Sequence, residues 1–576
     1  MPRQNADIAA VFDDMAEVLE IEGANPFRIR AYRNAARTLR DLPTDVSVML
    51  KQGADLTELP GIGKDLAAKI AEIVETGTAA SIEAHRNAVP ATLRALLGVP
   101  GLGPKRVQAL SRELGIRTLD QLHNAARAGR VRALPGFGEK TEQHILEHLS
   151  ARQEAAPRFQ LATATRYADA LVAYLRAVPG VTRVGVAGSY RRGRDTVGDL
   201  DIVVAASPGS GVMDRVVSYG EVESVLAQGP TKASVRLASH LQVDVRVIPE
   251  HSYGAALQYF TGSKAHNVAL RKLAQQRGLK LNEYGVFRGR RSVAGETEES
   301  VYAAVGLPWI PPELRENRGE VEAAREGRLP GLVELRDLKG DLHAHTKDTD
   351  GRNNLKEMAQ AAAARGFEYL AITDHSKRLA MAKGLDATRL RRQLETIEQL
   401  NAARIGITLL KGIEVDILED GSLDLPDDDL RQLDLVVGAV HSAFALSRAK
   451  QTERIMRAMD RPYFTMLAHP SGRLINERPP YEVDLPRLLR HARQRGCFLE
   501  VNAQPIRLDL TDRDCQLAKE EGVLVCINSD AHSTVDFDHR RYGVGQARRG
   551  WLEPRDVVNT RSLEALRPLL KQTMRG

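Results

Sequence analysis

The sequence has little cysteine and no long apolar run. Its three cysteines, Cys497, Cys515 and Cys526, form no CxxC pair among 576 residues. Such sparse cysteine excludes a disulfide framework and is typical of a reducing compartment, so we expect a cytoplasmic protein. No stretch approaches the roughly 20 apolar residues that cross a bilayer. The N-terminus is acidic and amphipathic, unlike a signal peptide, and we expect no membrane partner.

An excess of charge of one sign is also nearly missing, because the net charge is only +6. Its placement is uneven: residues 161–315 carry 19 Lys and Arg against 14 Asp and Glu. This local excess is compatible with a polyanionic partner in the middle of the chain. At roughly 150 residues per domain, the length predicts about four domains.

Three stretches in the first 150 residues repeat one design, a Pro-Gly pair, an apolar residue and a second Gly before an amphipathic helix: LPGIGKDLAAKI (59–70), VPGLGPKRVQAL (99–110) and LPGFGEKTEQHI (134–145). A Gly-x-Gly turn exposes free N–H groups at a helix N-terminus, which suits a phosphate. A single copy is as often a plain tight turn. Three copies favour helix-hairpin-helix binding to the DNA backbone without base specificity. The predicted DNA-binding residues are Gly61, Gly63, Gly101, Gly103, Gly136 and Gly138.

A pair of aspartates stands out in GSYRRGRDTVGDLDIVV (188–204). Asp199 and Asp201 lie two apart in a predicted strand, so both carboxylates point to one face and can share divalent cations. Asp244, in LQVDVRV, supplies a third carboxylate from a neighbouring strand. An isolated DxD is more often a surface ladder, but Gly188-Ser189 and Arg191-Arg192 precede this one and suit a triphosphate. Carboxylates, metal ions and a phosphate site indicate nucleotidyl transfer.

These residues carry a resemblance to the family X DNA polymerases over about residues 5–315. GSYRRG…GDLD resembles the palm motif of the family, YFTGSKAHNVALR (259–271) its nucleotide-binding segment and LKLNEYGVF (279–287) its thumb signature. LPGIGKDLAAKI and NPFRIRAYRNAARTL (25–39) resemble its small N-terminal domain. The resemblance implies that Asp199, Asp201 and Asp244 are catalytic and bind Mg²⁺ or Mn²⁺. It implies nucleotide contacts from Gly188, Ser189, Arg192, Gly198, Tyr259, Phe260, Gly262, Lys264, Asn267 and Arg271.

Two positions depart from the animal members of the family. Lys264 stands where those enzymes carry an acid, and a lysine there would contact the incoming nucleotide, as in the bacterial branch. Lys69 stands at the position of the lyase lysine, whose amine attacks a sugar aldehyde. Asp65 replaces a lysine that helps to hold the 5′-phosphate, so Lys69 is a possible lyase residue with an incomplete phosphate site; the alternative is a solvated helix lysine.

After a charged stretch at 311–331, the pattern changes to short apolar strands that alternate with amphipathic helices, which predicts a parallel β/α barrel or a relative of one. Metal-binding side chains follow nearly every one of these strands, beginning in DLHAHTKDTDG (341–351). One histidine at a strand end is more often a structural residue than a ligand. Here there are nine groups: His343, His345, Asp350, His375, Glu414, His441, His469, Asp530 and His532.

The carboxyl ends of the strands of a β/α barrel converge on one mouth, where nine ligands suffice for three metal ions. Mixed imidazole and carboxylate ligands suit Mn²⁺, Zn²⁺ or Fe²⁺, and such a cluster can activate water for phosphoester hydrolysis. The segment 338–560 resembles the PHP (polymerase and histidinol phosphatase) domain, with all nine metal positions present. Arg473, in HPSGR, is a further candidate for a phosphate contact, with a surface arginine as the alternative.

Together the two halves resemble the bacterial family X polymerases that carry a PHP domain. This implies gap-filling DNA repair with gapped or nicked DNA and dNTPs as partners, and 3′–5′ exonuclease activity that depends on manganese. Abasic-site endonuclease and 3′-phosphodiesterase activity are plausible in the same site. The alternatives are a purely structural PHP domain, a PHP site for a small phosphate ester, and a non-catalytic scaffold on DNA ends. We expect a monomer.

The predicted fold class is multidomain, with α-helical helix-hairpin-helix domains, an α+β nucleotidyltransferase palm with a thumb, and a distorted β/α barrel. The predicted boundaries are an N-terminal DNA-binding domain at 1–90, a fingers-like domain at 91–155, the palm at 156–248, the thumb at 249–312, a linker at 313–336 and the PHP domain at 337–576.

Overall fold

The structure, a computed structural model, describes residues 5–42, 46–76, 79, 81–82, 85, 89–99, 102–154, 158–207, 209–379 and 382–575. The chain forms two compact units, Met1–Ala156 and Pro157–Gly576. Gly101, one of the predicted DNA-binding glycines, lies outside the described residues. No helix among the described residues is both long and apolar enough to cross a bilayer.

The first unit is helical, as predicted. Its longer helices are α1 (Asn5–Glu22), α2 (Pro26–Asp41), α4 (Lys64–Thr76), α7 (Pro104–Leu114), α8 (Leu119–Arg127) and α9 (Glu139–Glu154), with the short α3 (Val46–Lys51) and α6 (Ala91–Arg94). Buried apolar side chains form two separate cores, one from residues 8–82 and one mainly from residues 89–149. Helix α1 contributes to both cores, because Val18 and Ile21 pack with the second.

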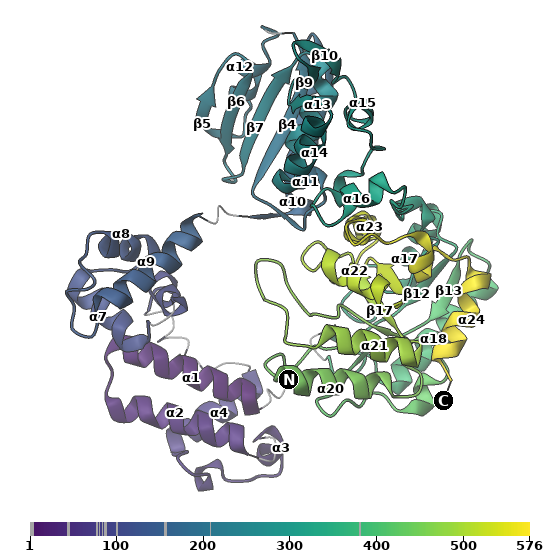
Figure 1. The fold of residues 1–576 in the computed structure, drawn as a ribbon. Helices are drawn as coiled ribbons and strands as arrows, with labels where there is room; N and C mark the ends of the chain where they lie inside the picture. The colour runs from purple at the N-terminus through teal and green to yellow at the C-terminus, as the bar shows by residue number, and fades with distance from the viewer. Residues whose placement is uncertain are drawn as a thin grey trace. The chain divides into compact units, whose positions relative to one another are not determined.

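The palm in the second unit is a five-stranded sheet in the order β2-β4-β7-β6-β5. Figure 1 labels β4, β5, β6 and β7 of this sheet. Its strands are β2 (Val181–Val186), β4 (Asp199–Ala206), β5 (Val222–Gln228), β6 (Lys232–Leu237) and β7 (Gln242–Ile248). Strands β4 and β7 are parallel, and the other pairs are antiparallel. Helix α10 (Leu161–Arg176) and helix α12 (Val212–Val217) bury their apolar side chains in the core of this sheet.

The thumb combines three helices with a small antiparallel sheet. The helices are α13 (Tyr253–Thr261), α14 (Lys264–Gln276) and α15 (Glu298–Ala304), and the strands are β8 (Lys280–Asn282), β9 (Gly285–Arg288) and β10 (Arg291–Ala294). The segment predicted as a linker at 313–336 is packed instead. It contains α16 (Glu320–Arg325), and its Arg315 and Glu320 are fully buried. Part of the charge that suggested a linker is buried in ion pairs, as with Arg315 and Glu298, whereas Glu322, Arg325, Glu326 and Arg328 are exposed.

The PHP domain has eight parallel strands in two sheets: β11 (Gly340–Asp341), β12 (Tyr369–Ile372) and β13 (Thr408–Lys411), then β14 (Glu414–Asp416), β15 (Val437–Ala439), β16 (Met466–Leu467), β17 (Phe498–Asn502) and β18 (Val525–Asn528). Isolated parallel bridges at His375–Glu414 and Ala344–Ala531 join the two sheets. The predicted single strand ITLLKGIEV is divided between β13 and β14. A side chain at Gly412, between them, would collide with the carbonyl of Ile372.

The helices of this domain follow the strands in alternation: α17 (Leu355–Ala364), α18 (Ala387–Ala402), α20 (Arg448–Met459), α21 (Leu485–Arg495), α22 (Asp512–Glu520), α23 (Arg540–Arg549) and α24 (Leu563–Thr573). Side chains on both faces of the strands are buried in two different cores. In β12, Leu370 and Ile372 belong to one core, and Tyr369 and Ala371 to the other. Burial on both faces explains the continuous apolar character of these strands.

Candidate active sites

The three aspartates lie together at the start of the parallel strand pair of the palm. Asp199 and Asp201 are on β4, and Asp201 is directly beside Asp244 of β7 in the register of the two strands. Alternation along β4 turns both aspartates to the same face, while Leu200 between them is buried in the core. The sequence therefore places three carboxylates from two strands within one site.

A glycine turn packs against this acidic group. Gly188 begins the short helix α11 (Gly188–Arg191) with φ +64°, and a Cβ there would overlap Oδ2 of Asp201. The backbone N–H of Ala187 also donates to the carbonyl of Asp201 at 2.7 Å. Glycine is required at 188 by its positive φ and by the close approach of the carboxylate.

Burial and the neighbouring carboxylates raise the pKa of Asp199 and of Asp201. Burial, together with the charges of Asp199 and Asp244, raises the pKa of Asp201 to about 7. Burial and the charge of Asp244 also raise the pKa of Asp199. The nearest ion pair is long, with Lys232 Nζ 3.6 Å from Asp244 Oδ2. Three carboxylates whose mutual repulsion is only partly offset by nearby cations fit hard divalent cations.

The predicted phosphate-binding arginine lies beside this group. Arg192 Nη1 donates to the carbonyl of Thr261 at 2.6 Å, and its Nε lies 3.0 Å from Glu316. Gly262 ends α13 at that point, with φ +66°, so the arginine reaches the end of the thumb helix. Ser189 lies on α11 and is half-buried, and Gly198 directly precedes β4.

The predicted sugar and base contacts lie on α13 and α14. The rings of Tyr259 and Phe260 meet edge to face at 5.2 Å, and Arg271 lies 5.8 Å from the Tyr259 ring. Asn267 is buried, and its Nδ2 donates to the carbonyl of Tyr259 at 2.7 Å. Lys264, by contrast, is exposed at the start of α14. The amide of Asn267 thus holds the two helices together in this structure.

The three glycine turns share one geometry. In each, the N–H of the central apolar residue donates to the carbonyl three residues earlier, at 3.0 to 3.1 Å, and that apolar side chain is buried: Ile62, Leu102 and Phe137. Gly61 and Gly136 have φ +78° and +82°. A Cβ at Gly63, Gly103 or Gly138 would meet no atom within 4 Å. These three glycines therefore leave enough space for a DNA backbone to approach the turns closely.

The possible lyase residue is not free in the structure. Lys69 is largely buried on α4, and its Nζ is bonded to Asp65, one turn earlier. The residue that replaces the phosphate-binding lysine of the animal enzymes therefore holds the amine. An amine held in this way is a poorer nucleophile than a free one.

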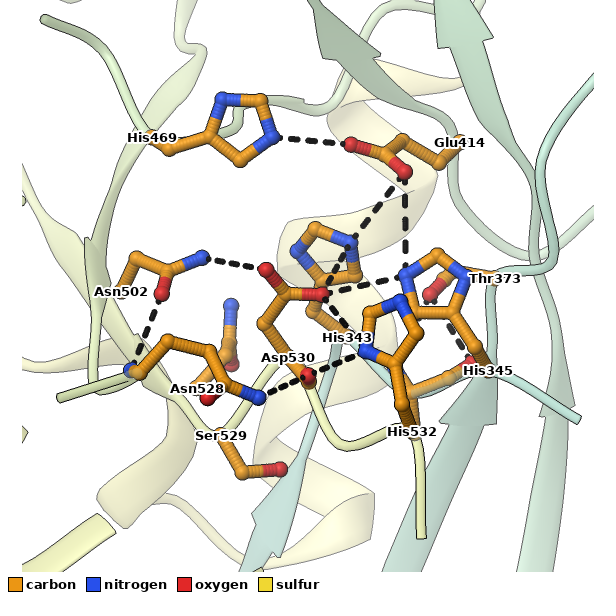
Figure 2. Close-up of polar contacts among 12 residues, drawn as sticks. His343, His345, Thr373, Glu414, His469, Asn502, Asn528, Ser529, Asp530 and His532 are labelled. Carbon is orange, nitrogen blue, oxygen red and sulfur yellow. Dashed lines mark hydrogen bonds and ion pairs between the residues drawn. The ribbon is translucent and has the colours of Figure 1, made fainter. Parts of the chain in front are cut away.

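Eight of the nine predicted ligands of the PHP domain lie in three groups whose donor atoms are within 4.8 Å of one another: His345, Asp350, His375 and His532; His343, His345 and Asp530; and His375, Glu414 and His441. Figure 2 shows part of this site, with His343, His345, Glu414, His469, Asp530 and His532. Glu414 lies at the centre, and His469 Nε2 is 3.1 Å from its Oε1. The strand ends that carry the ligands bring together residues up to 189 positions apart, from His343 to His532.

Several ligand atoms are buried without a hydrogen-bond partner of suitable geometry, among them His343 Nε2, His469 Nδ1 and Glu414 Oε2. Unpaired buried polar atoms cost free energy unless another group satisfies them. Although burial opposes protonation, the charge of Glu414 raises the pKa of His375 to about 10 and that of His441 to about 9. The carboxylates of the site thus attract cations, and metal ions bound there would displace the protons from these imidazoles.

Residues that sequence reasoning missed hold the ligands in place. Glu500 of β17 accepts a hydrogen bond from His343 Nδ1 at 2.7 Å, which leaves Nε2 toward the site. Asp416 of β14 does the same for His441 Nδ1 at 2.6 Å. Asn502 donates to Asp530 at 3.0 Å. Carboxylates behind metal-binding histidines fix the ring and its tautomer. The only signal in the sequence was the spacing of Glu500 and Asn502 on one face of their strand.

Arg473 is not a free phosphate contact, because other groups use its donors. Its Nη1 lies 3.0 Å from Asp195 of the palm, and its Nε and Nη2 donate to the carbonyls of Arg507 and Leu508. Arg507, on the other hand, lies 3.9 Å from Asp530 and is partly exposed. Arg507 therefore borders the group of candidate metal ligands.

Fold and sites define a chain that joins a nucleotidyltransferase of the polymerase type to a metal-binding PHP domain. Family models match a helix-hairpin-helix domain (residues 3–79), a SAM-like helix-hairpin-helix tandem (93–151), the DNA polymerase beta thumb (256–316) and the PHP domain (341–504). The chain is 38% identical to the DNA polymerase/3′–5′ exonuclease PolX of Bacillus subtilis, over 98% of this chain and 99% of that protein.

Partial matches agree with this division. A probable phosphatase of Thermoanaerobacter sp. is 32% identical over 35% of this chain and 81% of its own length. DNA polymerase lambda of Rattus norvegicus is 26% identical over 54% of this chain and 56% of its own length. The chain belongs to the PolX family, the family X DNA polymerases that carry a C-terminal PHP domain.

Proposed function

We propose that this chain is a DNA-repair polymerase that fills short gaps in DNA and trims 3′ ends in its PHP domain. The observation that supports it is the presence of two sets of candidate ligands in one chain: three palm aspartates on neighbouring strands, and eight grouped PHP residues with His469 beside Glu414. The similarity to a named polymerase/exonuclease over nearly the whole chain supports both activities.

In the palm, Asp199, Asp201 and Asp244 would hold Mg²⁺ or Mn²⁺. Bound there, the ions lower the pKa of the primer 3′-hydroxyl and neutralise the triphosphate. The 3′-oxygen attacks the α-phosphorus, the bond to the β-phosphate oxygen breaks, and pyrophosphate leaves. Arg192 binds the triphosphate, with Ser189 and the backbone at Gly188 as further donors. Tyr259, Phe260 and Arg271 border the sugar and base.

In the PHP domain, the nine ligands would hold up to three ions of the Mn²⁺, Zn²⁺ or Fe²⁺ type. Bound there, the ions supply an activated water and a clamp for the phosphate. Glu500 and Asp416 hold His343 and His441 in the orientation that this requires. Arg507 donates to the scissile phosphodiester. The same hydrolysis would serve abasic-site incision and removal of blocked 3′ ends, because each hydrolyses a phosphoester and leaves a 3′-hydroxyl end.

In the helical unit, the glycine turns would bind the phosphates on either side of a gap. A gap-filling polymerase needs contacts with DNA phosphates to hold a short duplex without reading its base sequence. The open positions Gly63, Gly103 and Gly138 leave room for the DNA backbone.

The test follows a labelled primer on a duplex with a one-nucleotide gap and a 5′-phosphate, in Mn²⁺, with and without dNTPs. We expect extension to be lost only in Asp201→Ala, and shortening without dNTPs to be lost only in His343→Ala. The matched controls are Asp214→Ala and His240→Ala, since Asp214 lies on α12, His240 is exposed, and neither belongs to a ligand set. Shortening that survives His343→Ala would assign the nuclease activity elsewhere.

A second candidate for the PHP site is hydrolysis of a small phosphate ester, which the probable phosphatase of Thermoanaerobacter favours. The two candidates differ in competition. If DNA is the substrate, gapped duplex at micromolar concentration should inhibit hydrolysis of a chromogenic phosphodiester. Hydrolysis that is unaffected by DNA and prefers a small monoester would favour the phosphatase.

A further inference from the structure

The turn that carries Arg192 is held by the PHP domain. A buried group of charges joins the palm, the segment after the thumb and the PHP domain, with four arginines that share two carboxylates: Arg192, Arg194, Arg318 and Arg549 with Glu316 and Asp512. The carboxylates are largely buried, at 12% and 20% side-chain exposure. The group has two more cations than anions, so its net positive charge would attract a bound anion.

Arg549, on α23 of the PHP domain, is the link in this group. It is 4% exposed, and each of its two terminal nitrogens is bonded. Nη1 donates to the carbonyl of Arg192 at 2.8 Å and lies 3.1 Å from Glu316. Nη2 lies 2.7 Å from Asp512, which anchors the guanidinium within the PHP domain. Since Glu316 also binds Nε of Arg192 at 3.0 Å, Arg549 touches Arg192 both directly and through Glu316.

The other end of the same turn is held as well. Asp195, three residues after Arg192, pairs with Arg473 of the PHP domain at 3.0 Å. The backbone between Arg192 and Asp195 is therefore fixed at both ends by arginines of the other domain. A loop held at both ends by buried, charge-assisted hydrogen bonds has little freedom to reorient.

We propose that Arg549 is a positioning residue for nucleotide binding in the palm, acting through Glu316 and the backbone of Arg192. The inference rests on the proposed polymerase function and on the role of Arg192 in binding the triphosphate. Arg549 fixes the backbone from which Arg192 projects, and it neutralises Glu316. Without Arg549, the charge of Glu316 would be compensated chiefly by Arg192 itself, which would then be less available to a phosphate.

A neighbouring arginine provides a matched control. Arg548 is also on α23 and also forms an interface ion pair, at 2.7 Å to Glu313, with a further bond to the carbonyl of Val333. It makes no bond to Glu316 or Arg192 among the described residues. Arg548→Met thus removes one ion pair between α23 and the segment after the thumb, and Arg549→Met removes one such pair together with the pair to Asp512. Only the second variant removes the contact with the phosphate-binding turn.

The experiment measures single-nucleotide extension of a gapped duplex by the full-length protein, with kcat and KM for the dNTP. We expect Arg549→Met to raise the KM for the dNTP about tenfold over that of Arg548→Met, with kcat within about threefold. Arg549→Lys, which keeps the charge but not the fork of two nitrogens, should lie between them. Hydrolysis of a chromogenic phosphodiester by the PHP domain should stay within twofold in all three variants.

The possible outcomes distinguish failure of the role of Arg549 from failure of the proposed polymerase function. Equal KM values in Arg549→Met and Arg548→Met, with normal wild-type extension, would overturn the role of Arg549 and leave the polymerase function standing. A wild-type protein that extends no primer would overturn both. Loss of kcat and of phosphodiester hydrolysis together in Arg549→Met would show general damage to the interface in place of nucleotide positioning.

Discussion

At the scale of a single residue, Gly188 leaves the space that the carboxylate of Asp201 occupies. We expect Gly188→Ala to lower the rate of primer extension at least about 100-fold. The added methyl group would displace the carboxylate of Asp201 by up to about 1 Å. The matched control is Gly180→Ala, which has φ +82° but meets no atom within 4 Å, so it carries the backbone strain without the collision. Primer extension by both variants is the measurement, and equal rates would contradict the prediction.

Glu500 is a residue whose effect should be confined to the other site. It accepts the Nδ1 proton of His343, and Glu500→Gln would present an amide in its place. We expect metal affinity of the PHP domain to fall about 10- to 100-fold while primer extension is unchanged. Metal content after dialysis and phosphodiester hydrolysis are the measurements, with exposed Glu398→Gln as the control. A variant that retains its full metal content would refute this role.

That these histidines and acids gather at one place was predictable from the set as a whole, because imidazoles and carboxylates at many successive strand ends have few other common uses. The residues behind them were not. Glu500 and Asp416 are acids inside apolar strands, and whether such an acid faces a histidine depends on which strands become neighbours. The same limit applies to Lys69, whose amine the sequence left as a candidate and which the structure pairs with Asp65.

At the scale of an element, Glu298 at the start of α15 ties the thumb to the palm. It accepts from Arg191 at 2.7 and 2.8 Å, from Arg315 at 2.7 Å and from Trp309 Nε1 at 2.9 Å. Burial opposes ionisation, but the two arginines outweigh it and lower the pKa of Glu298 to about 2. A depressed pKa gives stability that is present above the unfolded value near 4.5 and is lost as the pH falls toward 2.

We therefore expect Glu298→Gln to destabilise the thumb by about 3 kcal/mol near neutral pH, and the difference from wild type to shrink between pH 4.5 and 2. Unfolding followed by Trp309 fluorescence, in a Trp551→Phe background that removes the other tryptophan, measures it. Exposed Glu299→Gln on the same helix is the control. A difference that is constant over this pH range would contradict the assignment.

Elements were predicted well where their periodicity was unbroken and poorly where tertiary contacts decide. The helices of residues 1–150 and the alternating strands of the PHP domain followed from pattern alone. The segment 313–336 did not, because its charge suggested solvent and the structure uses Arg315 and Arg318 in buried ion pairs. The division of the apolar run ITLLKGIEV between two sheets at Gly412 was likewise not predicted from the sequence.

At the scale of the whole molecule, the palm, thumb and PHP domain share apolar cores. Ile475, Leu508 and Tyr542 of the PHP domain belong to the core of the palm, and Trp551 packs against that of the thumb. The helical unit of residues 1–156 has cores of its own. Domains with a common core unfold together, so a change in stability at the PHP site should also change the stability of the thumb.

Removal of metal tests this coupling. Ions that bind only the folded state stabilise it by about 3 kcal/mol at a hundred times the dissociation constant. We expect chelation to lower the unfolding temperature reported by Trp309 in the thumb, in the Trp551→Phe background, although the PHP ligands lie in another domain. In His343→Ala the chelator should have a smaller effect, because that variant has lost part of its ligand set, and His240→Ala should behave as wild type.

If chelation removes the PHP ions without changing the unfolding temperature reported by Trp309, the thumb and PHP domain unfold independently. The shared cores would then be too weak to couple the two sites.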